Sequence, residues 1–250
     1  MTYNKKYITK LIAASLLGDG HVGKPESKHC RFSLSQRHDH KDYLEWFANR
    51  IDCVTSLSID YPSAAHKETR TVPFYDRSIT IQPQLRLRTK THPFFDKFRE
   101  RMYGTGRKSV DLHYLTLLDA EFLAIWYQED GSFSVDYRGK IPLPRIYIAS
   151  ESFSEAENVL LRKALKEKLD LDWNVHTSVN KLGNRTYKLY LSVKSANTFF
   201  ELVTPYVVPS FYYKVNVERL TPGIRDDDIV QPVLKDTELD RNDLAVHVCT

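Results

Sequence analysis

Two segments of the chain, residues 79–90 and 186–194, alternate hydrophobic and polar positions with the period of a β-strand. The apolar positions are Ile79, Ile81, Leu85 and Leu87 in the first segment, and Tyr187, Leu189, Leu191 and Val193 in the second. The polar positions are Gln82, Gln84, Arg86, Arg88 and Lys90 in the first segment, and Lys188, Tyr190, Ser192 and Lys194 in the second. We therefore predict half-buried antiparallel strands in both segments, with Pro83 marking an edge or a bulge.

The polar faces of these two strands carry no acidic residue, whereas ordinary solvent-facing strands mix acids and bases. Arginine, lysine, glutamine and tyrosine are side chains that contact base edges and phosphates. We predict that these faces bind DNA, together with Arg145 in the short apolar strand 145–150. The alternative is a solvated sheet face with no partner, which would give the same alternation.

The chain also repeats itself, and a repeat constrains the whole fold. Residues 85–98 align without gaps on residues 189–202, which places Leu87 on Leu191. In each half an apolar helical run ends in an acidic turn, IAASLLGDG at 12–20 and LAIWYQEDG at 123–131. Short strands at 31–36 and 145–150 follow these turns, and amphipathic helices at 39–52 and 154–169 follow the strands, the second with a Ser154–Glu157 capping box.

Each half therefore has the predicted order α-β-β-α-β-β-α, which gives an α+β fold made of two similar units. We predict a first repeat at 1–110, a second at 111–221 and an acidic C-terminal extension at 222–250. The whole chain has 250 residues and a net charge of +4, so the two repeats without the acidic extension are more basic than that value indicates. A basic body rich in aromatic residues suits a polyanionic partner.

The two acidic turns, Asp19-Gly20 and Asp130-Gly131, occupy equivalent places in the repeat. The expectation for each glycine is the left-handed conformation that ends a helix. In the first helix Ala14 and Gly18 are small, whereas their counterparts Ile125 and Glu129 are bulky, so the two helices could pack closely and bring the two carboxylates together. Two carboxylates at helix C-termini repel each other, and a divalent cation such as Mg²⁺ would offset that repulsion.

With these features the chain resembles the LAGLIDADG homing endonucleases, whose nine-residue motif matches both IAASLLGDG and LAIWYQEDG. Residues 199–214, FFELVTPYVVPSFYYK, resemble the C-terminal signature of that family. The resemblance covers about residues 8–216 and is closest to the single-chain, monomeric subgroup. It implies two pseudo-symmetric repeats whose four-stranded antiparallel sheets form a saddle over double-stranded DNA, and a metal-dependent endonuclease that leaves 3′ overhangs at a long asymmetric target.

The resemblance also implies roles for individual residues. Asp19 and Asp130 would bind divalent metal, Mg²⁺ or in its place Mn²⁺, assisted by the backbone carbonyls of Gly18 and Glu129. Each half of such an enzyme has a lysine near its active centre. Lys214 matches this position in the second half, and Lys108 matches it in the first, with Arg107 as the alternative. Gln36 fits a polar position that approaches the reacting water, and its counterpart Ser150, beside Glu151, departs from the family pattern.

Composition limits the other possibilities. The N-terminus lacks a signal-peptide pattern and no apolar run could cross a membrane, so we expect a soluble intracellular protein. Cys30, Cys53 and Cys249 are widely spaced, which favours reduced thiols, and the histidines around His21 do not have the spacing of a zinc site. The alternatives to DNA cleavage are a maturase that binds intron RNA and a DNA-binding regulator without cleavage. An intein nuclease is disfavoured, because the sequence ends in VHVCT without the His-Asn pair needed for splicing.

Overall fold

The computed structural model describes residues 4–74, 77–180 and 182–221, so the predicted acidic extension and Cys249 lie outside the described residues. The chain divides into two compact units within helix α3 (Asp96–Tyr103), the first ending at Glu100 and the second beginning at Arg101. Cys30 and Cys53 are free thiols, and only Cys30 is buried. Among the described residues, no helix is both long enough and apolar enough to traverse a bilayer.

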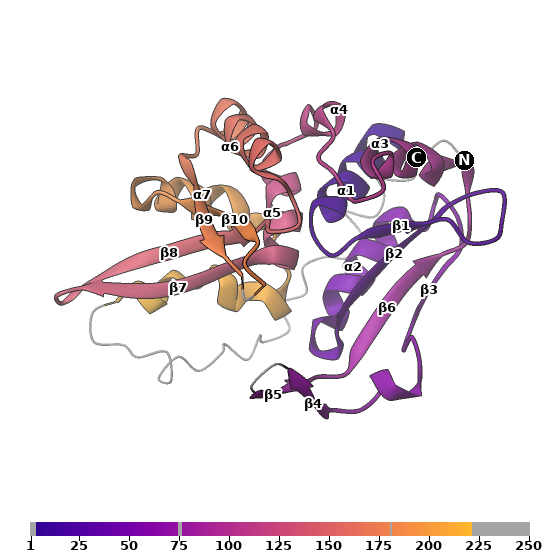
Figure 1. Ribbon diagram of the computed structural model, residues 1–250, viewed down its shortest axis with the longest axis horizontal. Helices are drawn as coiled ribbons and strands as arrows, with labels where there is room; N and C mark the ends of the chain where they lie inside the picture. The colour runs from indigo at the N-terminus through magenta and orange to yellow at the C-terminus, as the bar shows by residue number, and fades with distance from the viewer. Residues whose placement is uncertain (1–3, 75–76, 181, 222–250) are drawn as a thin grey trace. The chain divides into compact units, whose positions relative to one another are not determined.

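The first unit has the predicted order of elements, with one insertion. Its helices are α1 (Lys5–Leu17), α2 (Lys41–Ile51) and the beginning of α3. Its main sheet, sheet 1, has the order β1-β2-β6-β3, and its strands are β1 (His21–Gly23), β2 (Arg31–Arg37), β3 (Leu57–Asp60) and β6 (Gln84–Thr89). The hairpin β4–β5 (Arg70–Phe74 and Arg77–Ile81) is inserted between β3 and β6 and forms a separate two-stranded sheet (Figure 1).

The second unit repeats this order without the inserted hairpin. Its helices are α4 (Leu112–Leu115), α5 (Ala120–Asp130), α6 (Glu155–Leu169) and α7 (Ala196–Val203). Sheet 2 has the order β7-β8-β10-β9, with strands β7 (Gly131–Arg138), β8 (Ile141–Ala149), β9 (Trp173–Val179) and β10 (Arg185–Leu191). Short 3-10 turns follow α7, among them η5 (Thr204–Tyr206), η6 (Pro209–Lys214) and η7 (Val217–Leu220).

An amphipathic helix covers the apolar face of each sheet. In unit 1, Phe47 of α2 stacks on Phe32 of β2 with ring centroids 5.6 Å apart, and both side chains are fully buried. In unit 2, the buried side chains of Leu161 and Leu165 on α6 face β9 and β10. The predicted capping box at Ser154 and Glu157 is confirmed. These two cores leave the other face of each sheet partly exposed.

The predicted strand 79–90 is wrong, because Pro83 breaks it into two strands of different sheets. Residue Ile81 ends β5, and β6 begins at Gln84. The break is held by the His38 amide, which donates to the Pro83 carbonyl at 2.8 Å. Proline has no N–H to continue a ladder, which is why the chain changes sheets at this point. Gln82 therefore lies between the strands, and Lys90 lies just beyond β6.

The gap-free alignment of the repeats is shifted by two residues from the register of the sheets. Leu34 pairs with Leu87 in sheet 1, and Ile148 pairs with Leu189 in sheet 2. Leu34 lies two residues before Gln36, and Ile148 lies two residues before the counterpart Ser150, so Leu87 matches Leu189 and not Leu191. The cause is a shorter connection after β10, where the next 3-10 turn begins at Val193, two residues after the strand ends at Leu191.

Candidate active site and nucleic-acid interface

The two acidic turns differ in geometry, and neither glycine has the predicted left-handed conformation. Helix α1 ends at Leu17, so Asp19 lies in a turn before β1, whereas Asp130 is the last residue of α5 and Gly131 begins β7 directly. Gly131 has φ −83° and ψ 157°, and Gly20 is not among the described glycines with positive φ. The prediction of left-handed helix ends is therefore wrong at both positions.

Close packing, and not backbone conformation, requires glycine at these turns. A Cβ atom on Gly20 would lie 2.5 Å from the Ser15 hydroxyl oxygen and 2.7 Å from the Ser15 carbonyl oxygen. On Gly131 it would lie 2.0 Å from the Tyr127 ring. Each acidic turn is thus pressed against the last turn of its own helix, which fixes the backbone that carries the carboxylate.

The first unit brings Asp19 and Gln36 together. Asp19 is exposed, and Gln36 lies on the buried side of β2 with 8% of its surface accessible. The side-chain amide of Gln36 donates to Asp19 Oδ2 at 2.7 Å. A neutral amide of this kind orients the carboxylate without neutralising its charge. Gly18, whose carbonyl is predicted to assist metal binding, is buried immediately before Asp19.

In the second unit the position equivalent to Gln36 is Ser150, whose side chain is engaged in other contacts. Ser150 is fully buried, and its hydroxyl donates to Asn158 Oδ1 at 2.5 Å. Glu151 forms an ion pair with Lys188 at 2.8 Å. Both residues therefore serve the packing of α6 and the face of sheet 2.

Lys214 lies over the last turn of α5, whose final residue is Asp130. Its ammonium donates to the Gln128 carbonyl at 2.6 Å, and only 8% of its surface is accessible. Its own carbonyl accepts from the Tyr127 hydroxyl at 2.8 Å. Burial raises the pKa of Tyr127, so this hydroxyl keeps the proton that it donates. A cation is favoured at a helix C-terminus, where the helix dipole is negative.

Gln128 is a site residue that the sequence analysis missed. Its side chain is fully buried. The amide donates to the Tyr206 carbonyl at 3.3 Å, and its oxygen accepts from the Val208 amide at 2.8 Å. These bonds fasten the segment that leads to Lys214 onto α5. The one signal in the sequence is a neutral polar residue within the apolar run LAIWYQEDG, since such a residue must satisfy its hydrogen bonds when buried.

Lys108 lies in unit 2, in the segment that connects α3 to α4, and its side chain is half-exposed. The neighbouring Arg107 binds Glu157 of α6 at 2.6 Å. The Arg107 guanidinium is therefore engaged by a carboxylate of α6, and the choice between Lys108 and Arg107 as the basic group of the first half stays a prediction. Asp19 and Lys108 belong to different units, as do Asp19 and Asp130, so their approach stays a prediction.

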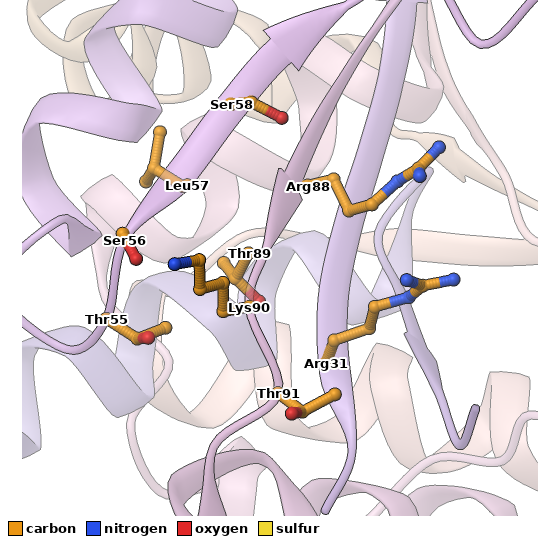
Figure 2. A pocket seen from close by; sticks show the side chains of 9 residues that line it. All are labelled: Arg31, Thr55, Ser56, Leu57, Ser58, Arg88, Thr89, Lys90 and Thr91. Atoms are coloured by element: carbon orange, nitrogen blue, oxygen red, sulfur yellow. The ribbon is translucent and has the colours of Figure 1, made fainter. Parts of the chain in front are cut away.

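The exposed face of sheet 1 carries cations that have no ion pair within the described structure. Arg31 and Arg88 extend in the same direction from β2 and β6, whereas Lys90 points the other way, toward Thr55 and Ser56 (Figure 2). Together with neighbouring hydroxyl groups they line an open pocket whose lining includes no acidic residue. The predicted residues Gln84 and Arg86 share this face, and Arg86 donates to the Ser35 hydroxyl at 2.9 Å.

The exposed face of sheet 2 is different, because its predicted DNA-binding cations are paired with acids. Arg145 binds Asp136 at 2.8 Å, and the hydrogen bond from Arg145 lowers the pKa of that carboxyl. Lys188 binds Glu151, and this contact raises the pKa of the Lys188 ammonium. Tyr190 lies beside Tyr147, with ring centroids 5.4 Å apart. Strand β10 itself carries no acidic residue on this face, as predicted. The face as a whole is not free of acids, because other parts of the unit supply them.

Lys194 does not lie on the predicted strand. Strand β10 ends at Leu191, and Lys194 follows in a 3-10 turn, where its ammonium binds Asp172 at 2.7 Å. It therefore belongs to the border of α6 and β9, where it helps to line a second pocket. Within the described residues no cluster of three or more histidine, cysteine or acidic side chains is placed to hold a metal ion.

Two αββαββα repeats define the class of protein, each with an acid at or just after the end of the helix that leads into its sheet, α1 or α5. Residues 9–199 match the LAGLIDADG DNA endonuclease family model, so the chain belongs to the LAGLIDADG DNA endonuclease family. The fold is also that of a solved structure, the homing endonuclease I-WcaI bound to its DNA recognition sequence. That likeness has a TM-score of 0.65 at 20% identity and covers 86% of this chain and 88% of the other.

Two curated relatives give the range of proteins in which similar chains occur. Protein RecA of Mycobacterium shimoidei is 29% identical over 231 residues, which cover 89% of this chain and 48% of that protein. The chain thus spans about half the length of this relative. The cytochrome b mRNA maturase bI2 of Debaryomyces hansenii is 26% identical and is matched over 86% of this chain and 77% of its own length.

Proposed function

We propose that this protein is a site-specific endonuclease that hydrolyses both strands of double-stranded DNA with divalent metal ions bound at Asp19 and Asp130. The observation that carries the proposal is the orientation of Asp19 by the Gln36 amide at 2.7 Å, in a chain that belongs to a DNA endonuclease family. The proposed target is long and asymmetric, the products have 3′ overhangs, and the protein acts as a monomer with repeats at 1–110 and 111–221.

The residues at the two acidic turns fit a hard divalent cation. Each unit offers one carboxylate beside the backbone carbonyls of Gly18 or Glu129, and none of these donors is a sulfur or an imidazole. Mg²⁺ prefers few protein oxygens together with water and substrate phosphate, and Mn²⁺ accepts the same oxygen donors. When bound, such an ion supplies a Lewis acid that activates water and stabilises charge on the phosphate.

The side chains of the chain itself would orient and neutralise the reacting groups. Asp19 is fixed by Gln36, whose amide can also direct a water toward the phosphate. Lys214 is held beside the end of α5 by the Gln128 carbonyl, where its positive charge would stabilise the developing negative charge on the phosphodiester. Lys108 is proposed to do the same for the first centre. Each of the two active centres would then cut one DNA strand.

Contacts with DNA are proposed for the exposed faces of the two sheets. On sheet 1, Arg88 and its neighbours would reach base edges in the major groove. On sheet 2, Arg145, Lys188 and Tyr190 would do so, with ion pairs that must open or be shared when DNA binds. Gln82 and Lys90 flank β6 and are proposed to contact the DNA backbone.

The experiment that tests this function is the selection of a cleaved sequence from a randomised DNA library in the presence of Mg²⁺. The expected result is one long asymmetric site that the native protein cuts on both strands. The Asp19→Asn, Asp130→Asn double variant should cut neither strand of this site. Tight and specific DNA binding without any cleavage would overturn the proposal and favour a DNA-binding regulator.

A second candidate function is the maturation of intron RNA, which is favoured by the similarity to a cytochrome b mRNA maturase. The test is a splicing reaction on intron-containing RNA, with and without the protein. Acceleration of splicing by the Asp19→Asn, Asp130→Asn variant would show an activity that is independent of the proposed cutting site.

A further inference from the structure

Glu157 makes more contacts than the start of a helix requires. Within its capping box it accepts a hydrogen bond from the Ser154 amide at 2.8 Å, and only 9% of its surface is accessible. It also accepts from the Arg107 guanidinium at 2.6 Å and from the Val110 amide at 3.0 Å. A capping box needs only the first of these contacts, so the other two serve the segment between α3 and α4.

These additional contacts lie on both sides of Lys108. Arg107 precedes it, Val110 follows two residues later, and the Arg107 guanidinium also donates to the Lys108 carbonyl at 2.9 Å. We name Glu157, Arg107 and the Val110 amide the Glu157 clamp. The clamp fastens the backbone of Lys108 to the first turn of α6, while the side chain of Lys108 stays half-exposed.

The Glu157 carboxyl of the clamp is ionised over the whole physiological pH range. Burial alone would raise the pKa of Glu157, but the hydrogen bonds from Arg107, Ser154 and the Val110 amide together lower it to about 2. The Arg107 side chain is 50% exposed. Because one partner of the ion pair is exposed, solvent screens the attraction between the two charges. The clamp therefore matters more for the position of the segment than for the free energy of unfolding.

We propose that Arg107 and Glu157 are positioning residues that fix the backbone of Lys108, the basic residue proposed for one of the two active centres. The proposal rests on the proposed function, in which Lys108 acts on one of the two cleaved strands. Lys214 is held differently, by the carbonyl of Gln128 and the hydroxyl of Tyr127. Loss of the clamp should therefore disturb one active centre and leave the other intact.

The test compares Arg107→Gln with Lys163→Gln and Lys108→Met. Lys163→Gln is the matched control, because this variant removes one positive charge from an exposed ion pair between Lys163 and Glu167 on α6. Single-turnover cleavage of the selected DNA target is followed with a different label on each strand. Arg107→Gln is expected to slow one strand by about 10-fold, since small misplacements of reacting groups cost up to about 10²-fold. Lys108→Met should slow the same strand further, Arg107→Lys should recover part of the rate, and Lys163→Gln should change neither strand.

A second measurement does not depend on cleavage. Hydrogen exchange of the Val110 amide, followed by mass spectrometry of the peptide that contains residues 104–111, should be faster in Arg107→Gln and Glu157→Gln than in the native protein or Lys163→Gln. Unchanged exchange in both clamp variants would overturn the proposal whether or not the protein cuts DNA. Equal slowing of both strands by Arg107→Gln would also overturn it. Failure of the proposed function is distinguishable, because the native protein would then cut neither strand.

Discussion

The two repeats of this protein place different groups around equivalent acids. In the first, β2 supplies the amide of Gln36, which contacts Asp19 directly. In the second, the same position is Ser150, whose hydroxyl binds Asn158 of α6. The charged group near the second acidic turn is instead Lys214, whose ammonium binds the Gln128 carbonyl in the last turn of α5. The topology is therefore shared, while the chemistry around each carboxylate has diverged.

The sheets differ in the same way. Arg31 and Arg88 on sheet 1 have no ion pair within the described residues, whereas Arg145 and Lys188 on sheet 2 are bound to Asp136 and Glu151. A free cation gains more from a phosphate or a guanine than one that must first leave a carboxylate. The charge counted along a strand therefore overstates the electrostatic contribution of that strand where neighbouring segments supply acids.

The largest effect on this comparison is expected from Lys214→Met. The change removes a buried positive charge at the last turn of α5, and we expect cleavage of one strand to slow by about 10²- to 10³-fold, the range for loss of one group that stabilises developing negative charge. The measurement is single-turnover cleavage with the two strands labelled separately. The Lys194→Met variant is the control, because Lys194 is bound to Asp172 at the border of α6 and β9. Equal rates on both strands in Lys214→Met would contradict the assignment.

The next effect concerns the packing of the acidic turns. Gly131→Ala would place a Cβ atom 2.0 Å from the Tyr127 ring, and Tyr127 also holds Lys214. We expect a loss of about 1–3 kcal/mol in the free energy of unfolding, the usual cost of overpacking. Gly23→Ala is the control, because its nearest contact would be a His21 ring atom at 3.4 Å. Denaturant unfolding checks both variants, and equal stability would show that the turn can relax.

The divergence of Gln36 and Ser150 leads to opposite expectations for their alanine variants. Gln36→Ala should slow cleavage of one strand by about 10-fold while leaving the protein stable, because it loses the contact that orients Asp19. Ser150→Ala should lower the free energy of unfolding by about 1 kcal/mol, since a buried hydrogen bond is lost, and should leave the ratio of the two strand rates unchanged. Strand-resolved cleavage and urea unfolding check the two claims. A change in the ratio of the strand rates for Ser150→Ala, together with a loss of stability for Gln36→Ala, would contradict them.

The smallest effect is expected from the sheet faces. Arg88→Gln should reduce the slope of log binding affinity against log salt concentration by about 1, the change expected for one lost phosphate contact. Lys188→Gln should reduce it less, because Lys188 is already paired with Glu151. Fluorescence anisotropy of labelled target DNA at several salt concentrations measures both slopes. A larger change for Lys188→Gln would show that its ion pair opens at little cost.

Local patterns predicted the elements of the fold well, because period and capping are properties of neighbouring residues. The helices around Ser154 and the strands at β2 and β8 are where the alternation and the capping box place them. The break at Pro83 was visible only as an edge or a bulge, since nothing local indicates that β5 pairs with β4 in another sheet. The register of β6 and β10 depends on pairings between distant strands, which the alignment of two segments cannot supply.

The candidate site was predictable where a repeat or a motif identified it. Asp19, Asp130 and Lys214 were proposed in this way and their roles stay predictions, while the contact of Gln36 with Asp19 agrees with its predicted place. The partners that hold these groups were not predictable, because they come from distant positions. Glu157 binds Arg107 across 50 residues of sequence, and Gln128 binds Lys214 across 86. The pairing of sheet 2 cations with Asp136 and Glu151 was missed for the same reason.

The central claim is that Asp19 and Asp130 are both required for cutting and neither is required for binding. The most direct test measures linear product from a plasmid that carries the selected target, with Mg²⁺, for Asp19→Asn and Asp130→Asn separately. We predict that each variant binds the target within about threefold of the native affinity, a difference of less than about 1 kcal/mol, and yields no linear product on the native timescale. Full double-strand cleavage by either variant would contradict it.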